Sequence, residues 1–114
     1  MNKELASEQR AISSFRGKAE KSSYKLKEGS WQRNLMDSYV KAADVALKLI
    51  DDDEASFGQE ELITAHKSLA DALLRAERAI GRFPAGSSQH TLQRNRIDAL
   101  KAAMKLIEKG QGIS

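Results

Sequence analysis

Apolar residues recur at steps of three and four along most of the chain, the spacing that places them on one face of an α-helix. The clearest stripe lies in residues 31–52, and a second lies in residues 59–82. A third stripe follows in residues 90–109. No segment shows the sustained alternation with β-branched residues that is typical of strands. The pattern therefore predicts an all-α protein with three strong helices.

The N-terminal segment carries a weaker stripe, which we interpret as a fourth helix over residues 2–28. Its apolar residues recur every seven positions, but polar residues stand between them and Gly17 interrupts the segment. Gly17 is where a break is expected, because glycine costs about 1 kcal/mol relative to alanine inside a helix. Two alternatives stay open for residues 1–28: a helix packed loosely on the others, or an arm ordered by a partner. Residues 111–114 are expected to fray.

Local signals mark the ends of these helices. Ser30 is placed to cap the helix that follows it, and either Ser56 or Gly58 caps the next one. Residues 83–88, which contain the single proline, are expected to form a loop. Short connections favour antiparallel neighbours. We therefore predict one domain over residues 1–114, an antiparallel three- to four-helix bundle.

The composition excludes several classes of protein. The chain contains no cysteine, so disulfides, thiolate metal sites and cysteine nucleophiles are absent. A reducing compartment fits this composition, and we expect a cytoplasmic location. No apolar run approaches the ~20 residues of a membrane span, so no membrane partner is expected.

Candidate catalytic and metal-binding groups are few. His66 lies on an apolar stripe, where a hydrogen-bonded histidine at the edge of the core is expected. His90 follows the proline loop, with no acidic residue nearby in sequence to orient it. The acidic run at residues 51–54 lacks the glycine and the distal glutamate of a calcium-binding loop. We therefore predict that the protein is not an enzyme and that it holds no cofactor and no metal.

The charges are unevenly distributed around a net charge of +3. Residues 1–30 and 62–114 are basic, whereas residues 31–61 carry eight acidic residues against three basic ones. In an up-and-down bundle, the first turn and the third turn lie at the same pole. This arrangement predicts a basic pole around the turn at residues 82–96. Its candidate contact residues are Trp31, Arg33, Arg75, Arg78, Arg82, His90, Arg94 and Arg96.

Two functions follow from this distribution. The leading hypothesis is a non-enzymatic helical interaction or regulatory module that binds a protein partner or its own copy, because oppositely charged regions favour oriented association. The alternative is a nucleic-acid-binding regulatory protein, in which arginine forks of the basic pole grip phosphates. An ordinary surface explains the same residues if the arginines complement helix dipoles and pair with nearby acids. Trp31 is then expected to anchor the edge of the core.

Overall fold

The structure is a computed structural model that describes residues 5–52 and 54–110. This part of the chain forms helices joined by short turns, with no strand, and the predicted all-α fold is confirmed. The start of the predicted N-terminal helix and the predicted frayed tail at residues 111–114 lie outside the described residues. The helices are α1 (Ala6–Tyr24), α2 (Trp31–Asp51), α3 (Gln59–Ile80) and α4 (Ser88–Gly110).

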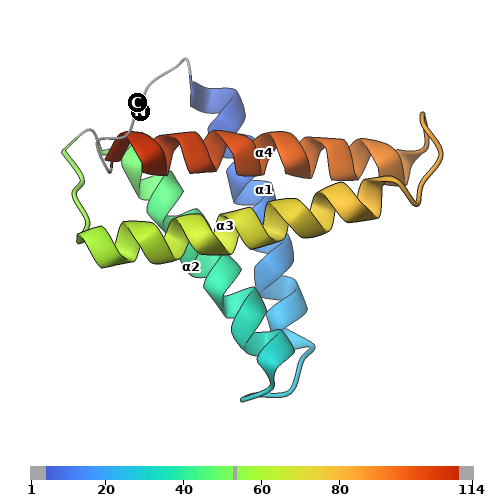
Figure 1. The fold of residues 1–114 in the computed structure, drawn as a ribbon, viewed down its shortest axis with the longest axis horizontal. Coiled ribbons are helices and arrows are strands. Elements are labelled where there is room, and N and C mark those ends of the chain that lie inside the picture. Colours follow the sequence, from blue (N-terminus) through green and yellow to red (C-terminus); the bar gives the residue numbers. More distant parts are fainter. Residues whose placement is uncertain (1–4, 53, 111–114) are drawn as a thin grey trace.

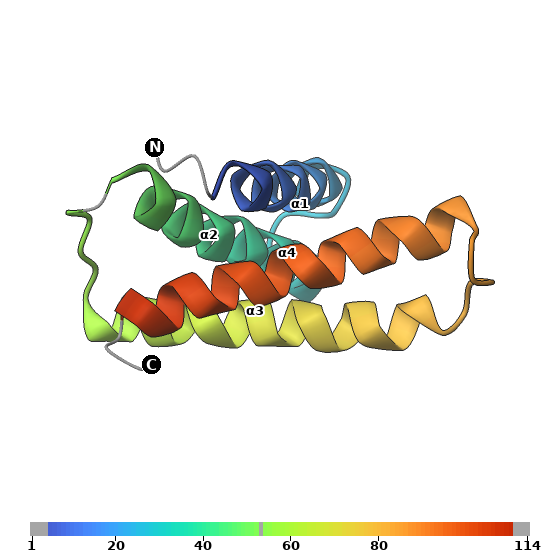
Figure 2. The same ribbon diagram turned by 90° about the horizontal axis from the view of Figure 1, so that it is seen from above.

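Consecutive helices form two antiparallel hairpins that cross each other. α1 lies against α2, and α3 lies against α4. The two hairpins are stacked as two layers, which Figure 2 shows from the side. Because they cross at a large angle, the α1/α2 turn and the α3/α4 turn project in different directions (Figure 1). The molecule is accordingly broad and flat, with extents of 40 × 35 × 21 Å.

The core lies where the hairpins cross. α1 contributes Ile12 and Phe15 to it, so the N-terminal helix packs on α2 and α4 of its own chain. Alanine is the most frequent buried residue, and its small side chain lets helices approach closely. The largest fully buried side chains are Ile12, Ile50, Leu69, Leu100 and Ile107, and the buried alanines are Ala19, Ala42, Ala43, Ala46, Ala65, Ala72, Ala76, Ala99 and Ala103.

The N-terminal helix differs from its prediction at Gly17 and at its C-terminal end. α1 continues through Gly17 without a break and ends at Tyr24, earlier than the predicted residue 28. It ends there because the next backbone N–H groups, of Lys25 and Leu26, turn back to carbonyls three residues earlier. Gly29 then reverses the chain with a φ of +85°, a conformation that favours glycine.

The other helix ends follow their capping residues closely. Ser30 Oγ accepts the backbone N–H of Arg33 at 3.2 Å, so the predicted cap of α2 is confirmed. Gly58 precedes α3 as its N-cap, and no side chain caps this end, so the Ser56 alternative is wrong. α4 begins slightly earlier than predicted because Ser87 Oγ accepts the backbone N–H of His90 at 3.1 Å. None of the described helices is long and apolar enough to cross a membrane.

Candidate interaction surface

The turn between α1 and α2 carries the two most exposed large apolar side chains of the described chain. Tyr24 ends α1 and is 70% exposed, and Trp31 begins α2 and is 64% exposed. The turn lies at the end of the hairpin that projects beyond α3 and α4 (Figure 1). The prediction that Trp31 anchors the edge of the core is wrong, because most of its side chain is exposed.

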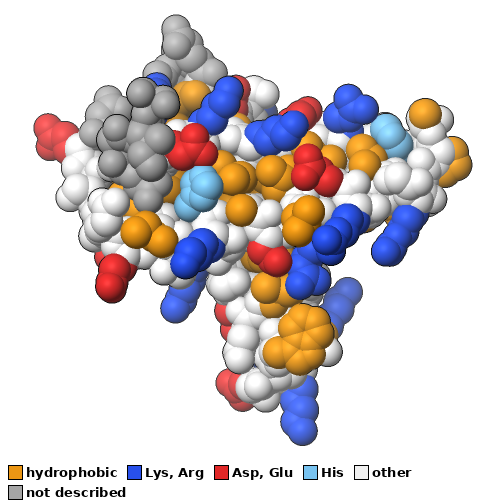
Figure 3. All heavy atoms as spheres, viewed as in Figure 1, with side chains coloured by type: hydrophobic (Ala, Val, Ile, Leu, Met, Phe, Trp, Pro, Cys, Tyr) orange, Lys and Arg blue, Asp and Glu red, His pale blue; other side chains and the backbone are white. Residues whose placement is uncertain are grey.

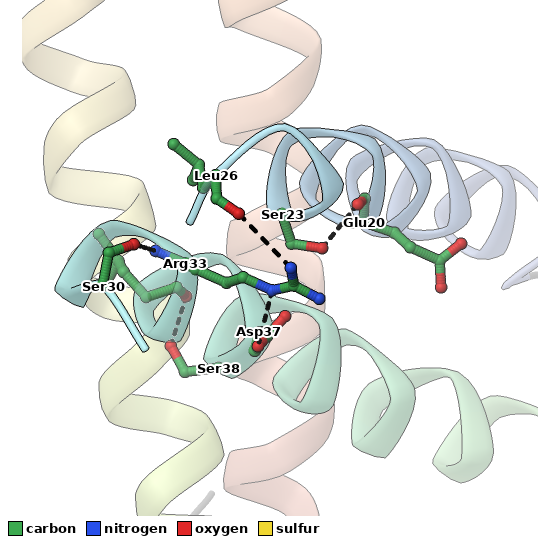
Figure 4. A network of polar contacts seen from close by, with 8 residues as sticks. Glu20, Ser23, Leu26, Ser30, Arg33, Asp37 and Ser38 are labelled. Carbon is green, nitrogen blue, oxygen red and sulfur yellow. Dashed lines mark hydrogen bonds and ion pairs between the residues drawn. The ribbon is translucent and has the colours of Figure 1, made fainter. Parts of the chain in front are cut away.

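Hydrogen bonds hold the turn in a defined shape. Arg33 reaches back from the first turn of α2, and its Nη1 donates to the carbonyl of Leu26 at 3.4 Å (Figure 4). Its Nε lies 4.0 Å from a carboxylate oxygen of Asp37. At the end of α1, the hydroxyl of the buried Ser23 donates to the carbonyl of Glu20 at 2.7 Å. Arg33 is therefore engaged within the turn, and the two aromatic rings flank a preorganised segment.

Three lysines and one glutamate, Glu28, lie close to these rings along the chain, all with exposed side chains. Lys21 lies one turn before the end of α1, and two further lysines lie in the turn itself. Figure 3 shows apolar side chains exposed on this arm beside charged side chains of both signs. We call this surface the aromatic tip; it consists of Lys21, Tyr24, Lys25, Lys27 and Trp31.

A second surface feature lies in the angle between α2 and α3. It is a groove of about 520 Å³ with an apolar floor and charged edges. Acidic side chains outnumber basic ones at its edges, and two of them lie in the first turn of α3, where the helix dipole favours negative charge. One acidic edge residue, Asp44, also pairs with Arg16 of α1. We call this surface the acidic groove; its floor includes Ala42, Val45 and Ala65, and its charged edge includes Lys41, Asp44, Glu60 and Glu61.

The predicted single basic pole is not formed. Because the hairpins cross, the α1/α2 turn with Trp31 and Arg33 lies far from the α3/α4 turn (Figure 1). The α3/α4 end of the molecule holds Arg82, His90 and Arg94. Short connections predict which helices run antiparallel, but they do not determine the angle between two hairpins.

The remaining predicted contact residues are Arg75 and Arg78 of α3, the latter in its last turn, and Arg96 of α4. Arg75 and Arg78 are exposed on α3, and Arg75 Nε donates to Asp71 Oδ2 at 2.9 Å. The ion pair expected for a surface arginine is thus present at Arg75. Arg96 is half-buried and lies over the ring of Phe15, 5.7 Å from its centroid. The structure therefore brings Arg75 and Arg96 to one cavity at the crossing, whereas Arg78 lies one turn beyond Arg75 and does not line that cavity.

His66 is a hydrogen-bonded histidine at the edge of the core, as predicted. Its Nε2 lies 2.9 Å from Glu108 Oε2, at a partly buried position between α3 and α4. His90 lies in the first turn of α4. Among residues 5–52 and 54–110, no group of three or more His, Cys, Asp or Glu side chains is arranged to hold a metal ion.

The acidic groove is the feature that sequence reasoning missed. Its acidic edge belongs to the acidic segment 31–61, which is visible in the sequence. The groove itself arises only because α2 and α3 diverge where the hairpins cross, and no periodicity within either helix signals that angle.

Comparison with protein-family models, with curated protein sequences and with solved structures finds no match for this chain. Its function is therefore inferred from the geometry of the tip, the groove and the crossing.

Proposed function

We propose that the protein is a non-enzymatic interaction module that associates with a second copy of itself by placing its aromatic tip in the acidic groove of the partner copy. The observation that carries this proposal is the exposure of Trp31 and Tyr24 on a turn of defined shape. Exposed tryptophan and tyrosine are the side chains that most often dominate binding energy when they fill a pocket on a partner. We place this activity in the cytoplasm, in keeping with a chain that contains no cysteine.

The charges of the two surfaces are complementary. The tip presents lysines, including Lys25 and Lys27, whereas the groove presents acidic side chains, including Glu60 and Glu61. Opposite charges at the edge of an interface accelerate encounter and select orientation more than they add affinity. They therefore steer the aromatic rings toward the groove rather than toward another apolar surface.

The apolar floor of the groove supplies the affinity. Its small side chains, such as Ala42 and Ala65, leave room for a planar ring, and the groove volume of about 520 Å³ accommodates side chains of this size. Burial of an aromatic side chain removes about 150–250 Å² from water. Because the turn is already held by Arg33, little conformational freedom is lost when it docks.

Both surfaces include residues of α2, and this favours a closed dimer. Trp31 begins the helix, and the groove residues Ser38 to Val45 follow along it. At 1.5 Å per residue, tip and groove are separated by roughly 10–20 Å along the helix axis. Two copies related by a twofold axis can therefore exchange both contacts, with the tip of each copy in the groove of the other.

Sedimentation velocity from micromolar to millimolar concentration tests the proposal. The wild-type protein is expected to form dimers, and its single tryptophan is expected to show a blue-shifted emission as Trp31 leaves water. Trp31→Ser should weaken the dimer by at least about thirtyfold, the effect of a hot-spot side chain. Leu92→Ser is the matched control, since Leu92 is 51% exposed but lies on α4 near the other turn.

A charge exchange identifies which surfaces meet. The charge of the tip is reversed in the double variant Lys25→Glu/Lys27→Glu, and the charge of the groove is reversed in Glu60→Lys/Glu61→Lys. Each double variant alone is expected to be monomeric. An equimolar mixture of the two restores both complementary contacts, so dimers should reappear. A strictly monomeric wild type, equal effects of Trp31→Ser and Leu92→Ser, or no rescue in the mixture would refute the proposal.

Single-stranded nucleic acid is the alternative partner for the tip, because bases stack on exposed aromatic rings and lysines neutralise phosphates. Titration of the protein with an oligothymidylate at several salt concentrations distinguishes the two partners through the emission of Trp31. Saturable quenching that weakens steeply with salt, in a protein that stays monomeric without the oligonucleotide, would assign the tip to nucleic acid.

A further inference from the structure

The crossing of the two hairpins forms an open cavity of about 240 Å³ whose charged lining residues are all cationic. Lys18 of α1, Arg75 of α3 and Arg96 of α4 all contribute to its wall. No Asp or Glu is among the described residues that line it. The rest of the wall is largely apolar and includes Phe15 and Met36.

Arg96 is the central group of this cavity. It is half-buried, and no hydrogen bond or ion pair reaches its guanidinium from the residues that the structure describes. Its guanidinium lies over the face of the Phe15 ring, and burial lowers the pKa of Arg96 below its usual value. Its five N–H donors have no acceptor among the described residues and are not buried, so they are available to an anion that enters the cavity.

A second unpartnered group lies one turn earlier on α4. The side-chain oxygen Oε1 of Gln93 is buried without a hydrogen-bond partner, and Gln93 lines the same cavity as Arg96. The NH₂ group of the same amide is not buried in this way, and it is the donor half of the side chain. Gln93 can therefore donate to an anion that is held by Arg96.

The other cations of the cavity differ in availability. Arg75 is already paired with Asp71, whereas Lys18 has no ion pair among the described residues and is exposed at the cavity mouth. A neighbouring cavity of about 410 Å³ shares Phe15, Lys18 and Arg96 with the first. Arg96 and Lys18 thus line both cavities, and neither forms an ion pair with the described residues.

From this arrangement we infer that the hairpin crossing binds a small organic anion, with a carboxylate or phosphate head group on Arg96 and Lys18 and an apolar body against Phe15 and Met36. The cavity is smaller than the roughly 300–1,000 Å³ typical of sites for drug-sized ligands. The ligand is therefore compact. Because Lys18 belongs to α1 and Arg96 to α4, the bound anion bridges the two hairpins and stabilises their crossing.

Titrations with phenyl phosphate, benzoate and inorganic phosphate at constant ionic strength test this inference. The measurements are the melting temperature and the NMR signal of the Arg96 Nε–H group. At least one organic anion should raise the melting temperature and shift this signal saturably, more strongly than inorganic phosphate does. Phenyl phosphate and benzoate distinguish a phosphate head group from a carboxylate.

Two glutamine variants separate the site from general charge effects. Arg96→Gln should weaken binding by at least about tenfold, because it removes charge-assisted hydrogen bonds. Arg94→Gln removes the same charge from the exposed face of α4 and should leave binding within twofold. If Arg96→Gln fails to fold, Lys18→Gln, at an exposed position, replaces it with the same expectation. Equal losses in the Arg94 and Arg96 variants, or no saturable shift with either organic anion, would overturn the inference.

Discussion

Tyr39 is the polar residue through which the two layers are joined inside the core. Its ring is buried and lies beside Phe15, with centroids 5.9 Å apart. Its hydroxyl donates to Asp71 of α3, which also accepts from Arg75. Burial raises the pKa of Tyr39, whereas the hydrogen bond from Tyr39 is the largest cause that lowers the pKa of Asp71. The Tyr39 hydroxyl therefore links α2 to the Asp71 carboxylate of α3 and favours its ionised form.

Tyr39→Phe tests this tie, because it keeps the ring and removes the hydroxyl. We expect the free energy of unfolding to fall by about 1–2 kcal/mol at neutral pH, as for a hydrogen bond to a partly exposed charged group. A carboxylate whose pKa is lowered on folding stabilises the protein above its unfolded pKa of about 4, and this contribution is lost as the pH falls through its folded pKa. The difference between wild type and variant should therefore shrink in acid.

Urea denaturation followed by circular dichroism at neutral pH and near pH 3 measures this difference. An equal difference at both pH values would show that the hydroxyl acts independently of the ionised Asp71. Asp71→Asn is the control, because it removes the ionisation and should abolish the pH dependence of the Tyr39→Phe effect.

At the scale of the helix, two glycines of the first hairpin have opposite roles. Gly17 lies inside α1 with ordinary helical geometry, and a Cβ built there meets nothing within 4 Å. Gly29 lies in the turn before α2 with a φ of +85°, although the space around it is equally open. The two positions differ in backbone conformation rather than in crowding.

Alanine substitution should therefore change stability in opposite directions at these glycines. Gly17→Ala is expected to raise the free energy of unfolding by about 0.5–1 kcal/mol, because alanine favours the helix and reduces the freedom of the unfolded chain. Gly29→Ala is expected to lower it by about 1–2 kcal/mol, because the left-handed conformation strains an L-residue. Thermal denaturation of both variants compares them directly, and a stabilised Gly29→Ala would contradict this account.

The helices themselves were predictable because each has its own local signals. The apolar stripe and the Ser30 cap mark α2 almost to the residue. α1 was less predictable, since a seven-residue apolar repeat continues to Leu26 while hydrogen bonds of the turn end the helix at Tyr24. Helix ends depend on capping and turn geometry, and a hydrophobic repeat alone does not report either.

At the scale of the whole molecule, the angle between the hairpins decides which side chains meet, and the sequence contains no direct signal for it. Arg75 and Arg96 are distant in sequence but line one cavity, whereas Trp31 projects on another arm. Two of eight predicted contact residues thus meet at the crossing. Prediction of such a site requires the packing of α2 against α3 and α4, which depends on the combined shape of several helix faces.

The crossing depends on small side chains, and this gives a final prediction. Ala43 and Ala46 of α2 are completely buried, and Ala103 of α4 is nearly so. Close-packed interiors have no space for added methylene groups, so Ala46→Leu should lower the free energy of unfolding by about 1–3 kcal/mol. Ala85→Leu is the control, since Ala85 is exposed in the α3/α4 turn and the same added volume meets solvent.

Equilibrium unfolding by urea provides the comparison, and equal stability of the two variants would show that the crossing tolerates a larger spacing. The same pair of variants also separates the two proposed sites. A displaced crossing disturbs the cavity around Arg96, so Ala46→Leu should weaken binding of the organic anion. The aromatic tip lies beyond the crossing and its turn is held by its own hydrogen bonds, so the turn geometry around Trp31 should persist in the same variant.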